Sequence, residues 1–75
     1  MKTVLVTGGA GYIGSKLVTK LLKDNYKVTV VDILKFSSKS LNHLFNNKNF
    51  IFVKGDVRNK NLMKKLINKH DFIFL

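Results

Sequence analysis

Cysteine is absent from this sequence of 75 residues, and with it every function that needs a thiol. Disulfide bonds, thiolate-bound metals and cysteine nucleophiles are excluded, and the composition is compatible with a reducing compartment. Histidine is scarce too, because only His43 and His70 occur, far apart and with no acidic partner at a spacing typical of metal ligands. We therefore expect no metal site.

Acidic residues are also few. Four aspartates stand against 14 lysines and arginines, and the formal net charge is +10. Such a charge suggests an anionic partner, either nucleic acid or a membrane surface. A solvated lysine face is the favoured alternative, since lysines recur singly or in pairs at a helical period. No basic stripe alternates with aromatic residues as a single-strand binder requires, so nucleic acid is the weaker hypothesis.

Long hydrophobic runs are missing as well. The first apolar run is broken by Thr7 and Gly8, so it is too short for a signal-peptide core or a membrane-spanning helix. Apolar residues nevertheless make up 45% of the chain, in short blocks typical of a globular α/β protein. We expect one small core, no second domain and a cytoplasmic location.

Four of the apolar blocks are typical of strands, and the first has the β-branched composition of a strand buried on both faces. They span residues 2–7, 27–32, 50–54 and 71–75. The alternation of strands with helical segments predicts an α/β fold of the Rossmann type, a parallel sheet with strand order 3-2-1-4 and flanking helices.

Helical periods separate these strands. Residues 12–23 form an amphipathic pattern that should end near Asn25, a residue suited to a left-handed conformation. A later helix should begin after Asn59 or Asn61 and continue to Lys69. Serines before residue 41 could also cap a short helix around residues 41–45.

A glycine-rich segment, Thr7-Gly-Gly-Ala-Gly-Tyr-Ile-Gly14, joins the first strand to the first helix. Gly8 permits a tight turn, Gly11 lets the backbone approach a pyrophosphate, and Gly14 allows the helix to pack closely on the strand. Amide groups at the helix N-terminus favour the negative charge of phosphates. Glycines also mark ordinary turns, but this context predicts a dinucleotide-binding loop.

A carboxylate completes the pattern. Asp32 ends the second strand, 18 residues after Gly14. This is close to the roughly 20-residue spacing of dinucleotide-binding proteins. Its charge suits the ribose hydroxyls and would repel a 2′-phosphate, which favours NAD over NADP. Lys35 could neutralise such a phosphate, so NADP is the alternative.

The segment Gly55-Asp-Val-Arg58 follows the third strand, at the carboxyl end of the sheet where ligands bind. From there Asp56 could accept a hydrogen bond from the adenine amino group, with Val57 against the ring. An ordinary Gly-Asp turn is the alternative.

With these segments the sequence resembles the extended short-chain dehydrogenase/reductase family, the NAD-dependent epimerases and dehydratases of nucleotide sugars typified by UDP-glucose 4-epimerase. The likeness covers the whole chain. It implies pyrophosphate contacts from the backbone of Tyr12 and Ile13, ribose contacts from Asp32 and Ile33, adenine contacts from Asp56 and Val57, and a position near the cofactor for Leu75.

The resemblance also implies that catalysis depends on later elements. In the family, a Ser or Thr and a Tyr-x-x-x-Lys pair assist transient hydride transfer. Tyr12 and Lys16 have this spacing but lie in the phosphate loop, so we assign no catalytic residue. We expect residues 1–75 to be the N-terminal part of an NAD(P)-binding Rossmann domain, truncated after the fourth strand and inactive by itself. A nucleotide sugar would bind only in a full-length relative.

Two other functions fit the sequence: an NADP-binding reductase-like protein of the same superfamily, and a small basic module that binds nucleotides or nucleic acid. The last strand would leave an apolar sheet edge, which full-length relatives cover with the next strand. Because exposed edges promote association, we expect the chain to self-associate, aggregate or fold poorly.

Overall fold

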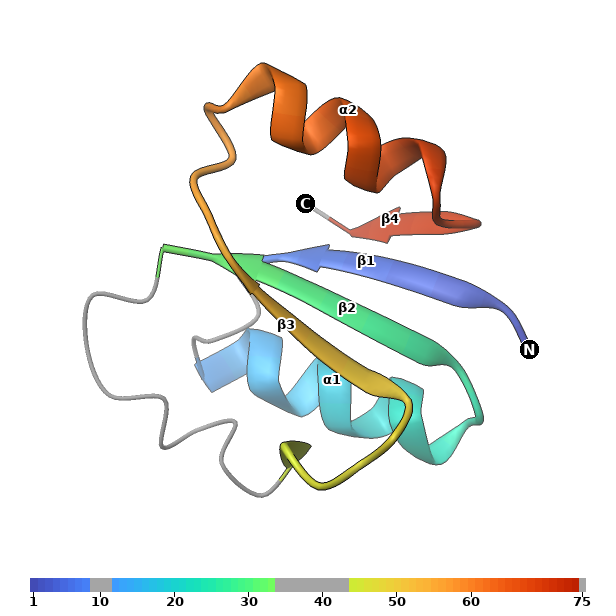
Figure 1. Ribbon diagram of the computed structural model, residues 1–75. Coiled ribbons are helices and arrows are strands. Elements are labelled where there is room, and N and C mark those ends of the chain that lie inside the picture. The colour runs from blue at the N-terminus through green and yellow to red at the C-terminus, as the bar shows by residue number, and fades with distance from the viewer. Residues whose placement is uncertain (9–11, 34–43, 75) are drawn as a thin grey trace.

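The computed structural model describes residues 1–8, 12–33 and 44–74. Four parallel strands form one sheet in the order β3-β2-β1-β4 (Figure 1). The elements are β1 (Thr3–Thr7), α1 (Tyr12–Lys23), β2 (Lys27–Asp32), β3 (Phe50–Lys54), α2 (Lys60–Asn68) and β4 (Phe72–Phe74). The predicted Rossmann-type sheet and its order are confirmed. Most of the short helix expected around residues 41–45 lies outside the described residues.

The two helices cover opposite faces of the sheet, so each face has its own hydrophobic cluster (Figure 1). The cluster between α1 and the sheet comprises the buried residues Val4, Val6, Val18, Leu22, Val28, Val30, Leu44 and Phe50. The cluster between α2 and the sheet comprises Leu5, Val31 and Met63, with Val53, Leu62 and Leu66 packed against them. Three consecutive residues of β1 are at most 2% exposed, as expected for a strand covered on both faces.

The helix ends follow local sequence signals. Asn25 has a φ of +68° just beyond α1, the left-handed conformation that its position predicts. Of the two predicted caps for α2, Asn59 is the one used, and its side chain accepts a hydrogen bond from the Leu62 N–H at 3.1 Å. The lysines of both helices are exposed, in agreement with a solvated face. Within the described ranges, neither helix has the length and apolar character needed to cross a bilayer.

The strand register brings the carboxyl ends of three strands to one edge of the sheet. Thr7 of β1 pairs with Val31 of β2, and Asp32 of β2 pairs with Lys54 of β3. Gly8 after β1 and Gly55 after β3 therefore lie on either side of the end of β2, and each N–H donates to a carbonyl of β2. In parallel α/β sheets this is the end at which ligands bind.

Candidate functional site

A hollow of about 250 Å³ lies at the carboxyl ends of the three aligned strands. It is lined by Thr7, Gly8, Val31, Asp32, Ile33, Gly55 and Val57. Gly8 and Asp32, which lie 24 residues apart in the sequence, thus line the same hollow. Thr7, Val31 and Gly55 are additional lining residues that the sequence pattern does not predict, because their place follows from the strand register.

Gly8 makes the turn out of β1. Its φ is +70°, and its N–H donates to the carbonyl of Val31 at 3.1 Å. A Cβ built on Gly8 would have no atom of the described residues within 4 Å, its chain neighbours aside. The backbone conformation, and not crowding, therefore requires glycine here. The space beside its Cα is open to a ligand.

Asp32 ends β2 on the other side of this hollow and is half-buried. Its carbonyl accepts a hydrogen bond from the Gly55 N–H at 3.0 Å, which ties the end of β2 to the turn after β3. Lys54 is its partner in the register, so a cation lies on the neighbouring strand. The next residue, Ile33, is 37% exposed and supplies an apolar wall.

A second hollow of about 430 Å³ adjoins the first and shares Ile33 and Gly55 with it. Its other lining residues are Lys54, Asp56 and Arg58. The volume is within the range of about 300 to 1,000 Å³ that small-molecule sites occupy. Asp56, predicted as an adenine contact, therefore lies in a space large enough for a ring system.

Arg58 holds the Asp56 carboxylate through three side-chain contacts. Nη2 donates to Oδ2 at 2.7 Å, and Nε donates to Oδ2 at 3.0 Å and to Oδ1 at 3.1 Å. The hydrogen bonds and the negative charge of Asp56 raise the pKa of Arg58 above its ordinary value, which favours a charged pair. The sequence pattern gives Arg58 no role, because only the path of the turn brings its side chain back to Asp56.

For three of the other predicted cofactor contacts, the structure describes the position in the fold but shows no site. Tyr12 and Ile13 form the start of α1 directly after the glycine loop, and Gly14 is half-buried in its first turn. Gly11 and Leu75 lie outside the residues that the structure describes. The cofactor contacts assigned to all five stay predictions.

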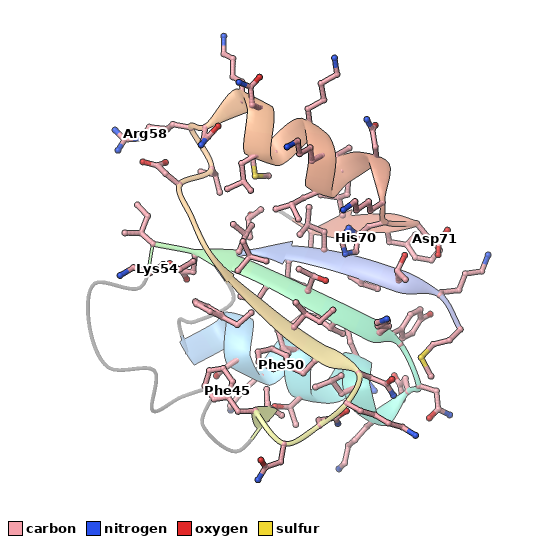
Figure 2. The ribbon with its side chains drawn as sticks, in the orientation of Figure 1. Phe45, Phe50, Lys54, Arg58, His70 and Asp71 are labelled. Atoms are coloured by element: carbon pink, nitrogen blue, oxygen red, sulfur yellow. The ribbon has the colours of Figure 1, made fainter. Side chains whose placement is uncertain are left out.

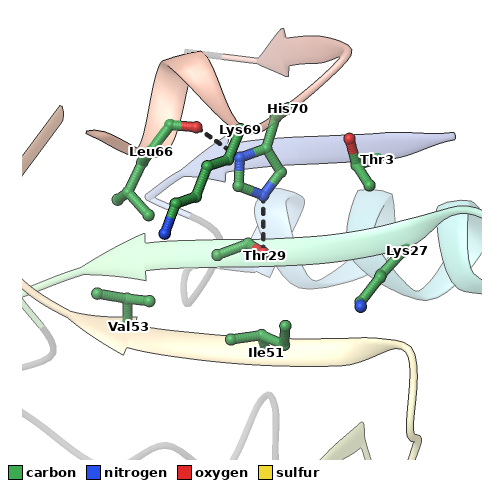
Figure 3. A pocket seen from close by; sticks show the side chains of 8 residues that line it. All are labelled: Thr3, Lys27, Thr29, Ile51, Val53, Leu66, Lys69 and His70. Carbon is green, nitrogen blue, oxygen red and sulfur yellow. Dashed lines mark hydrogen bonds between the residues drawn. The ribbon is translucent and has the colours of Figure 1, made fainter. Parts of the chain in front are cut away.

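A third hollow, of about 340 Å³, lies near the opposite end of the sheet, between its surface and α2 (Figure 3). His70 bridges the helix and the sheet there. Its Nδ1 lies 2.6 Å from the Leu66 carbonyl oxygen and its Nε2 lies 2.9 Å from the Thr29 hydroxyl. Because both ring nitrogens serve this cross-link, and because ligands bind at the other end of such sheets, we assign His70 a structural role.

Comparison with known proteins agrees with this architecture. Residues 5–73 match the protein-family model described as GDP-mannose 4,6 dehydratase. A UDP-N-acetyl-alpha-D-glucosaminuronate decarboxylase of Bacillus cytotoxicus is 40% identical over 73 residues, covering 97% of this chain and 22% of the relative. A putative UDP-glucose 4-epimerase of Methanocaldococcus jannaschii is 44% identical over 63 residues, covering 84% of this chain and 19% of the relative.

The solved structures give the same result. The dTDP-glucose 4,6-dehydratase of Bacillus anthracis, determined in complex with NAD, matches with a TM-score of 0.84 and 34% identity, over 97% of this chain and 25% of that one. The chain spans about a fifth of the length of the curated relatives it matches. Because the family model covers nearly all of the sequence, the chain belongs to the GDP-mannose 4,6 dehydratase family, among the NAD-dependent epimerases and dehydratases of nucleotide sugars.

Proposed function

We propose that the carboxyl end of this sheet binds the pyrophosphate and adenosine half of NAD. The observation that carries the proposal is that Gly8, with open space beside its Cα, and the Asp32 carboxylate line one hollow. An unobstructed backbone next to the start of α1 suits a diphosphate, and a carboxylate at the end of β2 suits ribose hydroxyls.

Different residues would contact the pyrophosphate, the ribose and the adenine of the cofactor. Backbone groups of the glycine loop would hold the pyrophosphate, Asp32 with Ile33 the ribose, and Asp56 with Val57 the adenine. The pyrophosphate group comprises Gly8, Gly11, Tyr12, Ile13 and Gly14, and Leu75 would lie near the cofactor. This division is supported by the two adjoining hollows, which extend from Gly8 to Arg58.

We infer that the chain supplies the cofactor-binding part of an enzyme that acts on a nucleotide sugar. Bound NAD would accept and return a hydride in that reaction. No residue of this chain is assigned to the chemical step, and a nucleotide sugar would need groups other than those of the hollows. The names of the dehydratase and epimerase relatives support the substrate class. A cytoplasmic location stays a prediction.

NADP is the second candidate, because Lys54 pairs with Asp32 in the sheet register and lines the adjoining hollow. A 2′-phosphate near these residues would be attracted by Lys54 and repelled by Asp32. We favour NAD because Asp32 lines the hollow beside Gly8, whereas Lys54 lines only the neighbouring one.

Replacing Asp32 tests the cofactor and its site together. Asp32→Ala should weaken NAD binding by about 1.5 to 3 kcal/mol, the contribution of hydrogen bonds to a charged group, and should leave NADP binding equal or stronger. Titration calorimetry with each dinucleotide measures both effects. Asp24→Ala is the matched control, since it removes the same charge at the far end of α1. Unchanged NAD affinity in Asp32→Ala, or tighter binding of NADP than of NAD by the unmodified chain, would contradict the proposal.

A further inference from the structure

The hollow beside His70 is formed by strand faces and by the end of α2, and not by the loops at the carboxyl ends of the strands (Figure 3). Its described lining residues are all different from those of the two hollows proposed to bind the dinucleotide. The volume of about 340 Å³ is near the lower end of the range of about 300 to 1,000 Å³ for small-molecule sites. This part of the sheet therefore offers space for a second ligand, smaller than a dinucleotide.

The floor of this hollow is apolar, because α2 covers the edge strand β3 only in part. Met63 of α2 is buried in one cluster with Val31 of the inner strand β2. On the neighbouring β3, Ile51 stays 42% exposed. Val53 of β3 and Leu66 of α2 continue the apolar surface within the hollow. An apolar ligand would remove this surface from water, which favours binding.

Two lysines give the same hollow a positive charge. Lys27 begins β2 and Lys69 is the C-cap residue of α2, so one cation comes from the sheet and the other from the helix. In Figure 3 both side chains lie over this face of the sheet. Neither lysine forms a salt bridge with a described residue, and none of the described lining residues is acidic. The charge of the hollow therefore favours an anion.

His70 fixes the helix end of the hollow, and both of its ring nitrogens are already hydrogen-bonded. Nδ1 bonds to the Leu66 carbonyl and Nε2 to the Thr29 hydroxyl. Figure 2 shows His70 between the end of α2 and the sheet. Thr29 is only 5% exposed, so its hydroxyl serves this cross-link and not a ligand. The charge of a ligand would therefore be met by the two lysines.

We propose that this hollow binds a medium-chain aliphatic carboxylate, with its carboxylate between Lys27 and Lys69 and its chain on Ile51 and Val53. A small inorganic anion would leave the apolar floor in contact with water, and an uncharged apolar molecule would leave both cations without a partner. A carboxylate is a small anionic head group, which suits a hollow of this size. The proposal goes beyond the cofactor site and does not depend on it.

The test titrates the isotope-labelled chain with octanoate and follows the amide chemical shifts. The shifts should be largest around Thr29, Ile51 and His70 and should saturate with a Kd on the order of 1 mM or lower, as expected for about ten non-hydrogen atoms. Hexanoate should bind more weakly, by up to about 15-fold, because two fewer methylene groups are buried. Octanol, which has the same chain without the charge, should bind at least about 2-fold more weakly than octanoate.

Substitutions separate the two parts of the site. Lys27→Gln and Lys69→Gln should each weaken octanoate binding about 2- to 5-fold and leave octanol binding unchanged, since each removes one cation. Ile51→Ser should weaken the binding of both ligands. Lys64→Gln is the matched control, because it removes an exposed cation of α2 that is not among the described lining residues, and it should change neither affinity.

Several results would overturn the inference. They are the absence of saturable shifts at about 20 mM octanoate, shifts centred on the carboxyl end of the sheet, equal affinities for octanoate and octanol, and an effect of Lys64→Gln as large as that of Lys27→Gln or Lys69→Gln. Failure of the chain to bind NAD would contradict the proposed function and leave this inference standing, so the two proposals are tested separately.

Discussion

At the level of one residue, Gly8 combines a left-handed backbone conformation with a place in the hollow at the carboxyl end of the sheet. Its positive φ lets the chain turn out of β1 while its N–H remains bonded to Val31. Its chain neighbours aside, no atom of the described residues would lie within 4 Å of an added Cβ, so a substitution here measures the conformational penalty without crowding from those residues.

Gly8→Ala should lower the free energy of unfolding by about 1 kcal/mol, the penalty of a left-handed conformation for an L-residue with a Cβ. Gly8→Asn should lose less, because asparagine tolerates this region best among residues with a side chain. Urea unfolding of the three proteins measures the difference. Equal stability of Gly8→Ala and the unmodified chain would show that the turn does not depend on the positive φ.

At the level of elements, a reciprocal clasp joins the start of β1 to the start of β4. The Asp71 carboxylate accepts hydrogen bonds from the Thr3 N–H at 2.9 Å and from the Thr3 hydroxyl at 3.1 Å. The Asp71 N–H in turn donates to the Thr3 carbonyl at 3.0 Å. The bonds from the Thr3 backbone and hydroxyl lower the pKa of Asp71 below its ordinary value of 3.8, because they favour the charged form.

This clasp should make the attachment of β4 sensitive to acid. A carboxyl group whose pKa is lower in the folded state stabilises folding above its unfolded pKa and loses that contribution as the pH falls through the folded value. The stability difference between the unmodified chain and Asp71→Asn should therefore be constant at neutral pH and shrink below about pH 4. Urea unfolding across this range measures it. Thr3→Val removes the hydroxyl donor but retains the backbone N–H, so the stability that it loses relative to the unmodified chain should also shrink below about pH 4, by a smaller amount. A stability loss of Asp71→Asn that does not change with pH would contradict the role of the charged Asp71 carboxylate.

For the whole molecule, the outermost position of β4 leaves apolar surface on the sheet. Phe72, Ile73 and Phe74 are 48%, 38% and 45% exposed. The clasp and the pairing with β1 hold this short strand in place, and no described element lies beyond it in the sheet. The apolar edge expected from the sequence is therefore exposed in the structure. Association through it stays a prediction.

We expect the chain to self-associate through β4, because an uncovered apolar edge can pair with another strand. Ile73→Lys should reduce the average mass measured by light scattering over a range of protein concentrations. Ile67→Lys, which adds the same charge at an exposed apolar residue of α2 and not on a sheet edge, is the matched control and should not reduce the mass. A chain that stays monomeric at every concentration, or equal effects of the two substitutions, would contradict this role of β4.

Local patterns were sufficient to predict the helices and strands, and to predict that Gly8 and Asp32 meet at one edge of the sheet. Alternating periods located both helices and all four strands to within about two residues. The fingerprint spacing paired Gly8 with Asp32, because a strand-helix-strand unit of that length brings both residues to the same edge. These features depend on neighbours along the chain and on general rules for crossovers, so they can be predicted before any coordinates are known.

The sequence by itself determined the order of the elements, the strand order of the sheet and the placement of Gly8 near Asp32. Only the tertiary structure decided which side chains meet across the fold. His70 bonds to Thr29 and Asp71 bonds to Thr3, over 41 and 68 residues, and Arg58 turns back onto Asp56. Such contacts depend on strand register, helix docking and side-chain rotamers. The helical and strand periodicities of the sequence do not predict these contacts, because each depends on the packing of segments distant in the chain or on the local path of a turn.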